Sequence, residues 1–302
     1  MFAVLYYIFI LPLIYLISIM PFWVLYGISD ILFVLMYYIF GYRKKVVMRN
    51  LQNAFPEKSP QELKTLERKF FRYLCDTILE TIKLITISPK ELLKRAALDE
   101  SVVSVFAQYK KENKSAIAVL GHAGNWEWAS NAFSIVVEQP MHGVYHQLSN
   151  KQFDKLLYDM RSRFGNVLIE MKNVVREMIK NKDTVCVNGF IADQTPAPEG
   201  AYWTKFLNQK TPVFYGTEKI ARKLNQPVVF ISVINVKRGY YRLEAEVLCE
   251  NPKDTKDGEI TEMHTRKLEK DILTQPENWL WSHKRWKHSG KYELLKEKGL
   301  VN

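Results

Sequence analysis

The chain has 302 residues, of which 47% are hydrophobic, and its formal net charge is +11. This length suits one large catalytic domain with a small additional element, or two modest domains, and the apolar fraction is enough for a sizeable core. The positive charge favours an anionic partner, namely nucleic acid, a membrane surface or an acidic protein, without choosing among them. The three cysteines, Cys75, Cys186 and Cys249, have no metal-like spacing and indicate reduced thiols facing the cytosol.

The N-terminus is strongly apolar and contains a single formal charge, Asp30, within residues 2–40. The stretch from Phe2 to Met20 approaches the roughly 20 apolar residues that cross a bilayer. The stretch from Phe22 to Phe40 is similar, but Asp30 in its middle would cost about 2.5 kcal/mol or more at mid-bilayer. We therefore expect one spanning or deeply inserted helix, followed by a second helix in the interface or against the catalytic domain. A two-helix hairpin is the alternative.

Basic residues follow this apolar segment, at Arg43, Lys44, Lys45 and Arg49. By the positive-inside rule they place the body of the protein in the cytoplasm, although an ordinary solvated helix face would look the same. Residues 1–29 lack a positive n-region and an A-x-A-like site, so a cleaved signal peptide is not expected. The sequence thus predicts a membrane anchor over residues 1–42 and an α/β domain over residues 43–302.

The rest of the chain alternates between helical and strand-like patterns. We expect helices within 43–95, from about Trp126, and over 151–164, 174–180, 214–224 and 259–273. We expect strands over 116–120, 141–145, 167–171, 184–192, 227–236 and 240–248, the last antiparallel to its predecessor. This alternation predicts an α/β domain with a mostly parallel central sheet flanked by helices on both faces. Ligands of such sheets bind at the carboxyl ends of the strands.

A histidine and a glutamate lie where a predicted strand gives way to a helix, in the segment GHAGNWE over residues 121–127. His122 and Glu127 are five residues apart, so they would diverge on one continuous helix. A loop at His122, with Gly124 supplying a permissive backbone and Asn125 capping the helix, would bring them together. A histidine held by a carboxylate can act as general base for an alcohol that attacks a carbonyl.

These residues resemble the H-x4-D/E motif of the glycerolipid and lysophospholipid acyltransferase superfamily, and more narrowly the late acyltransferases of lipid A biosynthesis. Further blocks similar to that family follow in the same order over almost the whole chain: residues 41–59 (GYRKKVVMRNLQNAFPEKS), 144–165 (VYHQLSNKQFDKLLYDMRSRFG), 191–196 (IADQTP) and 276–287 (PENWLWSHKRWK). The resemblance implies a glycerolipid acyltransferase-like fold. It also implies a protein at the inner membrane of the cell, with its catalytic domain on the cytoplasmic side.

The resemblance further implies transfer from an acyl carrier protein thioester to a hydroxyl of a lipid A precursor, with no cofactor. His122 and Glu127 match the catalytic pair. Matches to substrate-binding positions are Asn125, Asn150, Arg161, Arg163, Asp193, Gln194 and Arg285, and His283 and Trp286 also match the last block. Ala123 and the pair Thr195-Pro196 depart from the usual residues, which leaves the acyl-chain length and the acceptor open.

Geometry limits some of these assignments. Arg161 and Arg163 diverge by about 200° on a helix, so one of them is expected at the site, and we favour Arg163 because it lies nearer the helix end. Asp193 follows an apolar run, where a parallel strand would end, and is either a site residue or a turn residue before Pro196. His142 and His146 share a strand face but do not make a metal site without further ligands, and no metal is expected.

Other functions are compatible with the same sequence features. The acceptor could be another lipid hydroxyl, on a lysophospholipid or an aminolipid. A non-catalytic, basic, membrane-bound binding protein would share the anchor and the charge. Trp279, Trp281 and Trp286, which flank Lys284 and Arg285, could lie at a membrane interface or pack on the catalytic core. They could also stack on nucleobases, but the apolar N-terminus argues against a nucleic-acid partner.

Overall fold

The computed structural model describes residues 5–301, so residues 2–4 of the first predicted apolar helix lie outside the described residues. A central sheet of seven strands runs in the order β1-β9-β8-β2-β5-β3-β4. The strands are β1 (Ala96–Leu98), β2 (Ala116–Leu120), β3 (Met141–Tyr145), β4 (Val167–Glu170), β5 (Val187–Ile191), β8 (Val228–Lys237) and β9 (Tyr240–Cys249). All neighbouring pairs are parallel except β8 and β9, which form an antiparallel hairpin. The predicted α/β class and the mostly parallel sheet are confirmed.

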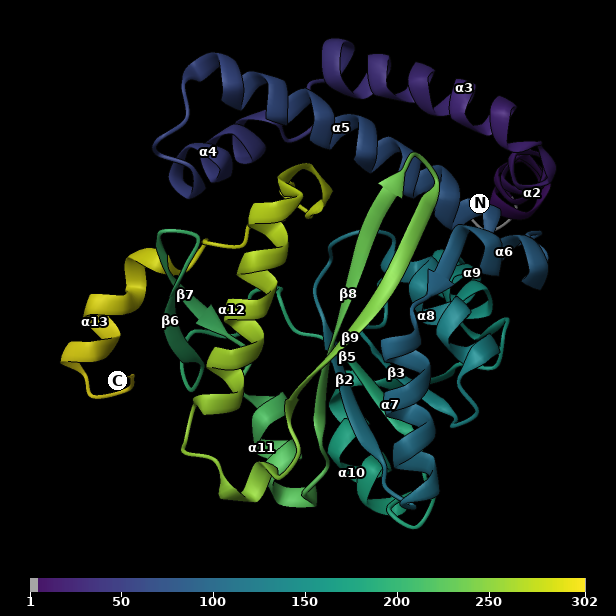
Figure 1. Cartoon of the computed structure of the whole chain (residues 1–302). Helices are drawn as coiled ribbons and strands as arrows, with labels where there is room; N and C mark the ends of the chain where they lie inside the picture. Colours follow the sequence, from purple (N-terminus) through teal and green to yellow (C-terminus); the bar gives the residue numbers. More distant parts are fainter. Residues whose placement is uncertain (1–4, 302) are drawn as a thin grey trace.

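Helices cover both faces of this sheet (Figure 1). They are α4 (Lys44–Ala54), α5 (Pro60–Lys83), α6 (Pro89–Arg95), α7 (Glu100–Lys111), α8 (Trp126–Val136), α9 (Lys151–Ser162), α10 (Val174–Lys180), α11 (Gly216–Leu224), α12 (Glu259–Thr274) and α13 (Tyr292–Glu297). Short helices connect them at η3 (Met171–Asn173), η4 (Pro252–Asp254), η5 (Pro276–Asn278) and η6 (Ser289–Lys291). The helices that cover the sheet bury apolar side chains against it, as expected of an α/β domain with helices on both faces.

Local sequence explains the elements that position the site. The run Ala116–Leu120 is buried throughout, as expected of a central parallel strand covered on both faces. Helix α5 begins with a capping box, in which Ser59 and Glu62 satisfy each other's backbone N–H, and Pro60 occupies the first turn. This helix is long and crosses above the carboxyl ends of the central strands, where the arrowhead of β8 also points (Figure 1).

Four elements had no clear sequence signal. The short strand β1 pairs in parallel with β9, and helix α7 follows it. Strands β6 (Tyr202–Phe206) and β7 (Gln209–Val213) form a separate antiparallel hairpin. Its turn residues, Leu207 and Asn208, both have positive φ, and neither is the glycine that usually marks such a turn.

The described part of the N-terminal segment forms two apolar helical stretches of unequal length. Helices η1 (Tyr6–Ile10) and α2 (Leu11–Ile19) make a short apolar stretch, whereas α3 (Phe22–Val34) and η2 (Leu35–Ile39) together are long and apolar enough to cross a membrane. The prediction that the first helix spans the membrane or inserts deeply into it stays a prediction, because its first residues lie outside the described part of the chain. Helix α3 packs along α5, which agrees with the expected contact between the second helix and the catalytic domain (Figure 1).

Candidate active site

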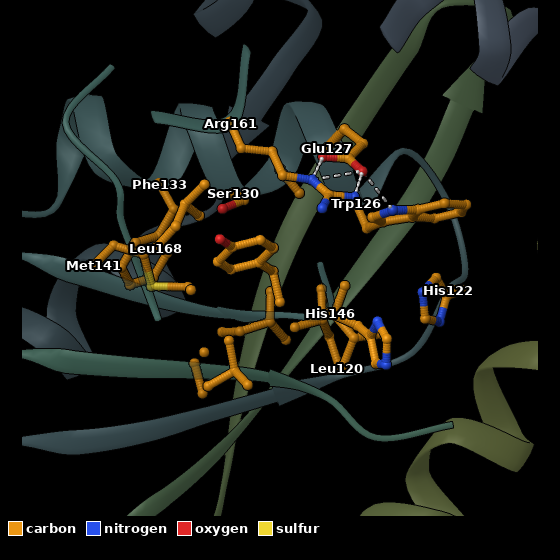
Figure 2. A pocket seen from close by; sticks show the side chains of 18 of the residues that line it. Leu120, His122, Trp126, Glu127, Ser130, Phe133, Met141, His146, Arg161 and Leu168 are labelled. Atoms are coloured by element: carbon orange, nitrogen blue, oxygen red, sulfur yellow. Dashed lines mark hydrogen bonds and ion pairs between the residues drawn. The ribbon is translucent and has the colours of Figure 1, made fainter. Parts of the chain in front are cut away.

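A cavity of about 300 Å³ opens beside the carboxyl ends of β2, β5 and β3. Its walls are mostly apolar, and its polar side chains include His122, Gln194, Glu127 and Arg161. The apolar lining includes Leu120, Phe133, Met141, Leu168, Phe214 and Ile231. The cavity therefore has a hydrophobic interior and a titratable group at one side (Figure 2).

His122 lies two residues after the end of β2, and Asp193 lies two residues after the end of the adjacent parallel strand β5. Nδ1 of His122 lies 2.6 Å from Oδ1 of Asp193, and the His122 backbone N–H donates to Oδ2 of the same carboxylate at 2.8 Å. The indole N–H of Trp279 donates to Oδ2 at 2.7 Å. Three donors therefore fix the carboxylate, and the carboxylate fixes the imidazole.

The charge on Asp193 is stabilised by the same contacts. Burial raises the pKa of this carboxyl, but the neighbouring His122 and the hydrogen bonds from His122 and Trp279 outweigh it and lower the pKa to about 2. An ionised Asp193 accepts from Nδ1–H, which leaves Nε2 of His122 as the proton-accepting nitrogen. Nε2 lies 3.2 Å from the amide nitrogen of Gln194, which can donate to it.

Glu127 does not orient His122, contrary to the sequence-based expectation. Its carboxylate accepts from Arg161 Nε at 2.9 Å and from Arg161 Nη2 at 2.6 Å, and the Trp126 indole donates to it at 3.3 Å. No hydrogen bond joins Glu127 to His122 in the part of the chain that the structure describes. The Trp126 ring lies between them, edge-on to the imidazole with centroids 4.9 Å apart (Figure 2).

The physical reason is the position of each carboxylate. Asp193 ends the strand next to β2, so it meets His122 across the sheet edge without any special turn. Glu127 lies in the first turn of α8, where the helix geometry directs it toward α9 and Arg161. We expected Asp193 among the substrate-binding residues, and the sequence signal that places it beside His122 is its position after a buried apolar run.

The backbone between His122 and α8 is held from several sides. Gly124 has a φ of +62°, and any side chain there would overlap Val233. Its carbonyl accepts from the Tyr73 hydroxyl at 2.6 Å, and its N–H donates to Asn278 O at 3.0 Å. Asn125 caps α8 through Trp128 N and donates to Glu80 at 2.7 Å. Asn125 is therefore a buried capping residue and does not line the cavity.

Other predicted site residues lie elsewhere. Arg163, which we favoured over Arg161, donates to the carbonyls of Leu84 and Ile87 after α5, so Arg161 is the arginine that lines the cavity. Asn150 caps α9 through the N–H groups of Gln152 and Phe153. These two residues support the fold around the site without lining the cavity.

The C-terminal block, residues 276–287, packs against His122 and Asp193. Trp279 and Trp281 are buried in the core and contact each other edge to face, so they are core residues and not a membrane belt. His283 lies 3.2 Å from the Thr195 hydroxyl, and burial lowers its pKa to about 4, so it is neutral at physiological pH. Arg285 is 1% exposed, and burial lowers its pKa to about 10.

Among residues 5–301, no group of three or more His, Cys, Asp or Glu side chains is arranged to hold a metal ion. His142 is buried and its Nδ1 has no partner in this part of the chain, while His146 lies at the cavity and contacts Gln147 O. The two histidines therefore do not share a site. The arrangement at His122 can accept a proton from a hydroxyl beside an apolar cavity.

The chain is similar to known proteins over most of its length. The model of a family described as bacterial lipid A biosynthesis acyltransferase matches residues 2–288. A lipid A biosynthesis lauroyltransferase of Escherichia coli (strain K12) is 26% identical over 250 residues, which cover 81% of this chain and 79% of that protein. A lipid A biosynthesis palmitoleoyltransferase of the same strain and a lipid A biosynthesis acyltransferase of Shigella flexneri are each 22% identical, with the same coverage.

Proposed function

Because the chain belongs to the bacterial lipid A biosynthesis acyltransferase family, we propose that it transfers a fatty acyl chain from an acyl carrier protein thioester to a hydroxyl of a lipid A precursor. The observation that supports this most strongly is the hydrogen bond between His122 and Asp193 beside an apolar cavity. The net charge of +11 suits both an acidic carrier protein and a phosphorylated lipid. We place the reaction at the cytoplasmic side of the inner membrane, with residues 1–42 as the anchor and residues 43–302 as the catalytic domain.

In this mechanism the acyl chain lies in the cavity and its thioester carbonyl lies near His122. Nε2 of His122 takes the proton of the acceptor hydroxyl while the oxygen attacks the carbonyl carbon. The tetrahedral oxyanion then collapses, the carbon–sulfur bond breaks, and the departing thiolate takes the proton from His122. The products are the new ester and the free thiol of the carrier, so no covalent intermediate on the protein is required.

Two neighbouring groups complete this proposal. Asp193 holds the imidazole in the tautomer that accepts at Nε2 and stabilises the imidazolium that forms. The amide N–H of Gln194, 3.2 Å from Nε2 before substrate binds, is well placed to donate to the oxyanion once the hydroxyl has replaced it at Nε2.

Glu127 has a positioning role here. It holds Arg161 by two charged hydrogen bonds, and Arg161 Nη1 makes no hydrogen bond within the described residues. We propose that this remaining N–H group contacts the phosphorylated acceptor, since a guanidinium suits phosphate recognition.

The test is an acyl-transfer assay with the purified full chain, an acyl carrier protein thioester, and either a lipid A precursor or a lysophospholipid as acceptor. The proposal predicts transfer to the lipid A precursor and loss of transfer by roughly 10³-fold or more in His122→Ala. Preference for the lysophospholipid would contradict the proposed acceptor. No transfer to either acceptor by the wild-type protein would favour a non-catalytic binding protein.

A further inference from the structure

The outer face of the N-terminal helices is apolar along its whole described length. Exposed side chains on it include Phe9, Leu13, Ile19, Trp23, Ile31 and Phe40. Trp23 is 78% exposed and Phe40 is 74% exposed, although both are large hydrophobic residues. A continuous surface of this kind is typical of an interaction site.

The inner face of α3 and η2 is bound to the catalytic domain over its full length. Leu25, Ser29, Phe33 and Tyr37 recur every fourth residue and are buried. The Ser29 hydroxyl donates to Asp76 at 2.6 Å, and the Tyr37 hydroxyl donates to Glu67 at 2.8 Å. Both partners belong to α5, so the two helices lie side by side (Figure 1).

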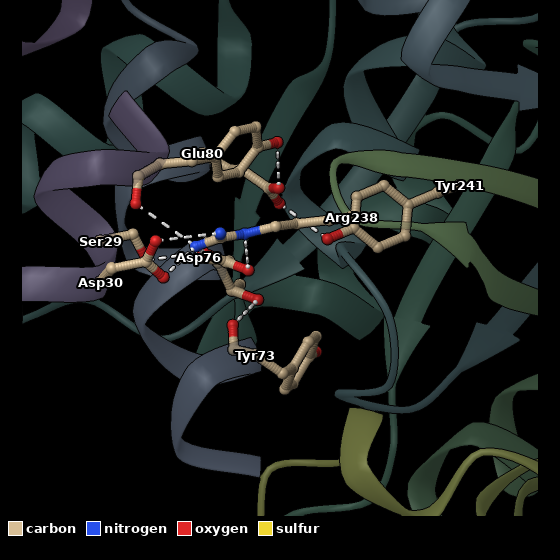
Figure 3. Close-up of polar contacts among 9 residues, drawn as sticks. Ser29, Asp30, Tyr73, Asp76, Glu80, Arg238 and Tyr241 are labelled. Atoms are coloured by element: carbon tan, nitrogen blue, oxygen red, sulfur yellow. Dashed lines mark hydrogen bonds and ion pairs between the residues drawn. The ribbon is translucent and has the colours of Figure 1, made fainter. Parts of the chain in front are cut away.

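Asp30, the one charge of this segment, is also paired. Arg238, at the tip of the hairpin between β8 and β9, lies 2.7 Å from both Asp30 and Asp76 (Figure 3). Its guanidinium therefore joins α3, α5 and the sheet in one polar cluster. Asp30 is neutralised at the edge of the domain and does not lie in the middle of an isolated membrane helix.

Helix α2 is held in the same way at its end. Lys83 Nζ donates to the carbonyls of Ser18 and Met20, at 2.7 and 2.8 Å. The Ser18 hydroxyl lies 2.8 Å from that of Thr86. These contacts fix the turn between α2 and α3 against the end of α5, so neither helix can leave the domain without breaking buried polar contacts.

Helix α5 is too charged to enter a bilayer beside α3. Its side facing α3 carries Glu67, Asp76 and Lys83, and its exposed residues include Arg68 and Arg72. If α3 crossed the membrane with its contacts intact, these groups would reach the hydrocarbon core, where each is strongly unfavourable. The contacts with α5 instead favour helices that lie along the membrane surface, with their exposed apolar side chains toward the lipid.

Cationic side chains near the apolar face indicate that this face suits anionic lipids. Lys44 Nζ lies 4.0 Å from the centre of the Tyr37 ring and the Arg72 guanidinium lies 5.1 Å from that of Phe33, so these two cations lie along the side of the helices that faces α5. Arg43 and Lys45 lie three and five residues after Phe40 and are exposed. Cations at the rim of an apolar face complement anionic headgroups.

We propose that α2 and α3 lie flat in one leaflet of an anionic phospholipid bilayer and that neither crosses it. The carboxyl ends of the central strands point toward this layer (Figure 1), and the cavity opens beside those ends. A lipid acceptor would then reach His122 without leaving the membrane surface. This inference rests on the membrane association in the proposed function and adds its geometry.

The test uses nitroxide spin labels on single cysteines at Trp23→Cys, Ile31→Cys and Phe40→Cys in the full chain, with Cys249→Ser to remove the half-buried native thiol. The protein is bound to vesicles of phosphatidylglycerol and phosphatidylethanolamine, and depth is measured from collisions with oxygen and with a water-soluble nickel complex. Trp23 and Phe40 are roughly 25 Å apart along the helix, close to the thickness of the hydrocarbon core. A flat helix therefore predicts similar immersion at all three positions.

A deep label at position 31 with shallow labels at 23 and 40 would show a spanning helix and overturn the proposal. Spin–spin broadening between labels without immersion would show a second copy on this face and would also overturn it. Leu294→Cys on α13, which is 52% exposed, is the aqueous control. Acyl transfer is measured on the same samples, so an inactive protein with three equally immersed labels would reject the catalytic proposal and retain this one.

Discussion

Nδ1 of His122 lies 2.6 Å from Oδ1 of Asp193, a residue 71 positions away in the chain. The two residues end adjacent parallel strands, so the sheet brings them together. Glu127, only five residues from His122, binds Arg161 instead. The base of the proposed reaction thus depends on the topology of the sheet, and in this proposal the nearby motif glutamate acts through Arg161.

Breaking the Glu127–Arg161 pair should weaken acceptor binding more than it slows the chemical step. We expect Glu127→Gln to lower kcat/KM for the lipid acceptor by roughly 10- to 100-fold, because a charged hydrogen bond is lost and Arg161 is left free to move. The pH profile should stay unchanged, since the partner of His122 remains. Steady-state kinetics with varied acceptor concentration measures both.

A double-mutant cycle provides the control. Arg161→Met should lower kcat/KM at least as much as Glu127→Gln, and the double variant should lose little more than Arg161→Met alone. Losses that multiply in the double variant would show that the two residues act independently and would refute the positioning role.

The interior of the cavity should set the preferred acyl-chain length. A Cβ at Gly189 would overlap the Met141 methyl group, and Met141 lines the cavity. Gly189→Ala should therefore displace Met141 and shift preference to shorter chains, whereas Met141→Ala should enlarge the cavity and admit longer ones. Competition among saturated acyl thioesters of different length, with products analysed by mass spectrometry, measures the shift.

Met178→Ala is a matched control for that pair, since Met178 is buried but does not line the cavity. It should lower stability by about 2–5 kcal/mol, as other large core truncations do, without changing the product distribution. Unchanged chain preference in both Gly189→Ala and Met141→Ala would show that the acyl chain binds elsewhere.

Glu80 should make stability depend on pH. Burial raises its pKa to about 7, although hydrogen bonds from Tyr241, Tyr26 and Asn125 act in the opposite direction. Because the folded-state pKa lies above the unfolded value, the folded protein binds this proton more tightly. That stabilisation is present below about pH 4 and is lost as the pH rises through about 7.

The Glu80→Gln variant has no titratable carboxyl group at this position. The free energy of unfolding of the wild type should therefore fall relative to Glu80→Gln between about pH 5 and pH 8, by up to about 3 kcal/mol. Denaturant titrations of both proteins across this range measure the difference. Curves that remain parallel would mean that Glu80 titrates alike in the folded and unfolded states.

Much of the fold could be predicted because its strands are short apolar runs bounded by polar residues. The segments at Ala116–Leu120 and Val228–Lys237 are examples, and the helix at Lys151–Ser162 was marked by its Asn150 cap. The hairpin of β6 and β7 could not be predicted, since its turn at Leu207-Asn208 adopts positive φ without a glycine.

The candidate site was only partly predictable. His122 is recognisable from its motif, but sequence distance favours the nearest carboxylate as its partner. A contact between residues that follow neighbouring strands cannot be found from sequence distance. The side-chain direction of Arg161 and Arg163 also depends on where α9 lies, because periodicity shows that they diverge but not which of them faces the cavity. The contacts that hold the N-terminal helices to α5 depend on tertiary packing alone.

The most direct test of the account compares kcat for Asp193→Asn and Glu127→Gln in purified protein at saturating acyl carrier protein thioester and lipid A precursor. Asparagine keeps the size of the side chain but cannot hold His122 in the tautomer that accepts at Nε2. We predict that Asp193→Asn loses roughly 10³- to 10⁴-fold in kcat, and that Glu127→Gln stays within about tenfold of the wild type. A folded Asp193→Asn variant with near wild-type kcat, or a loss in Glu127→Gln as large as that in Asp193→Asn, would contradict the account.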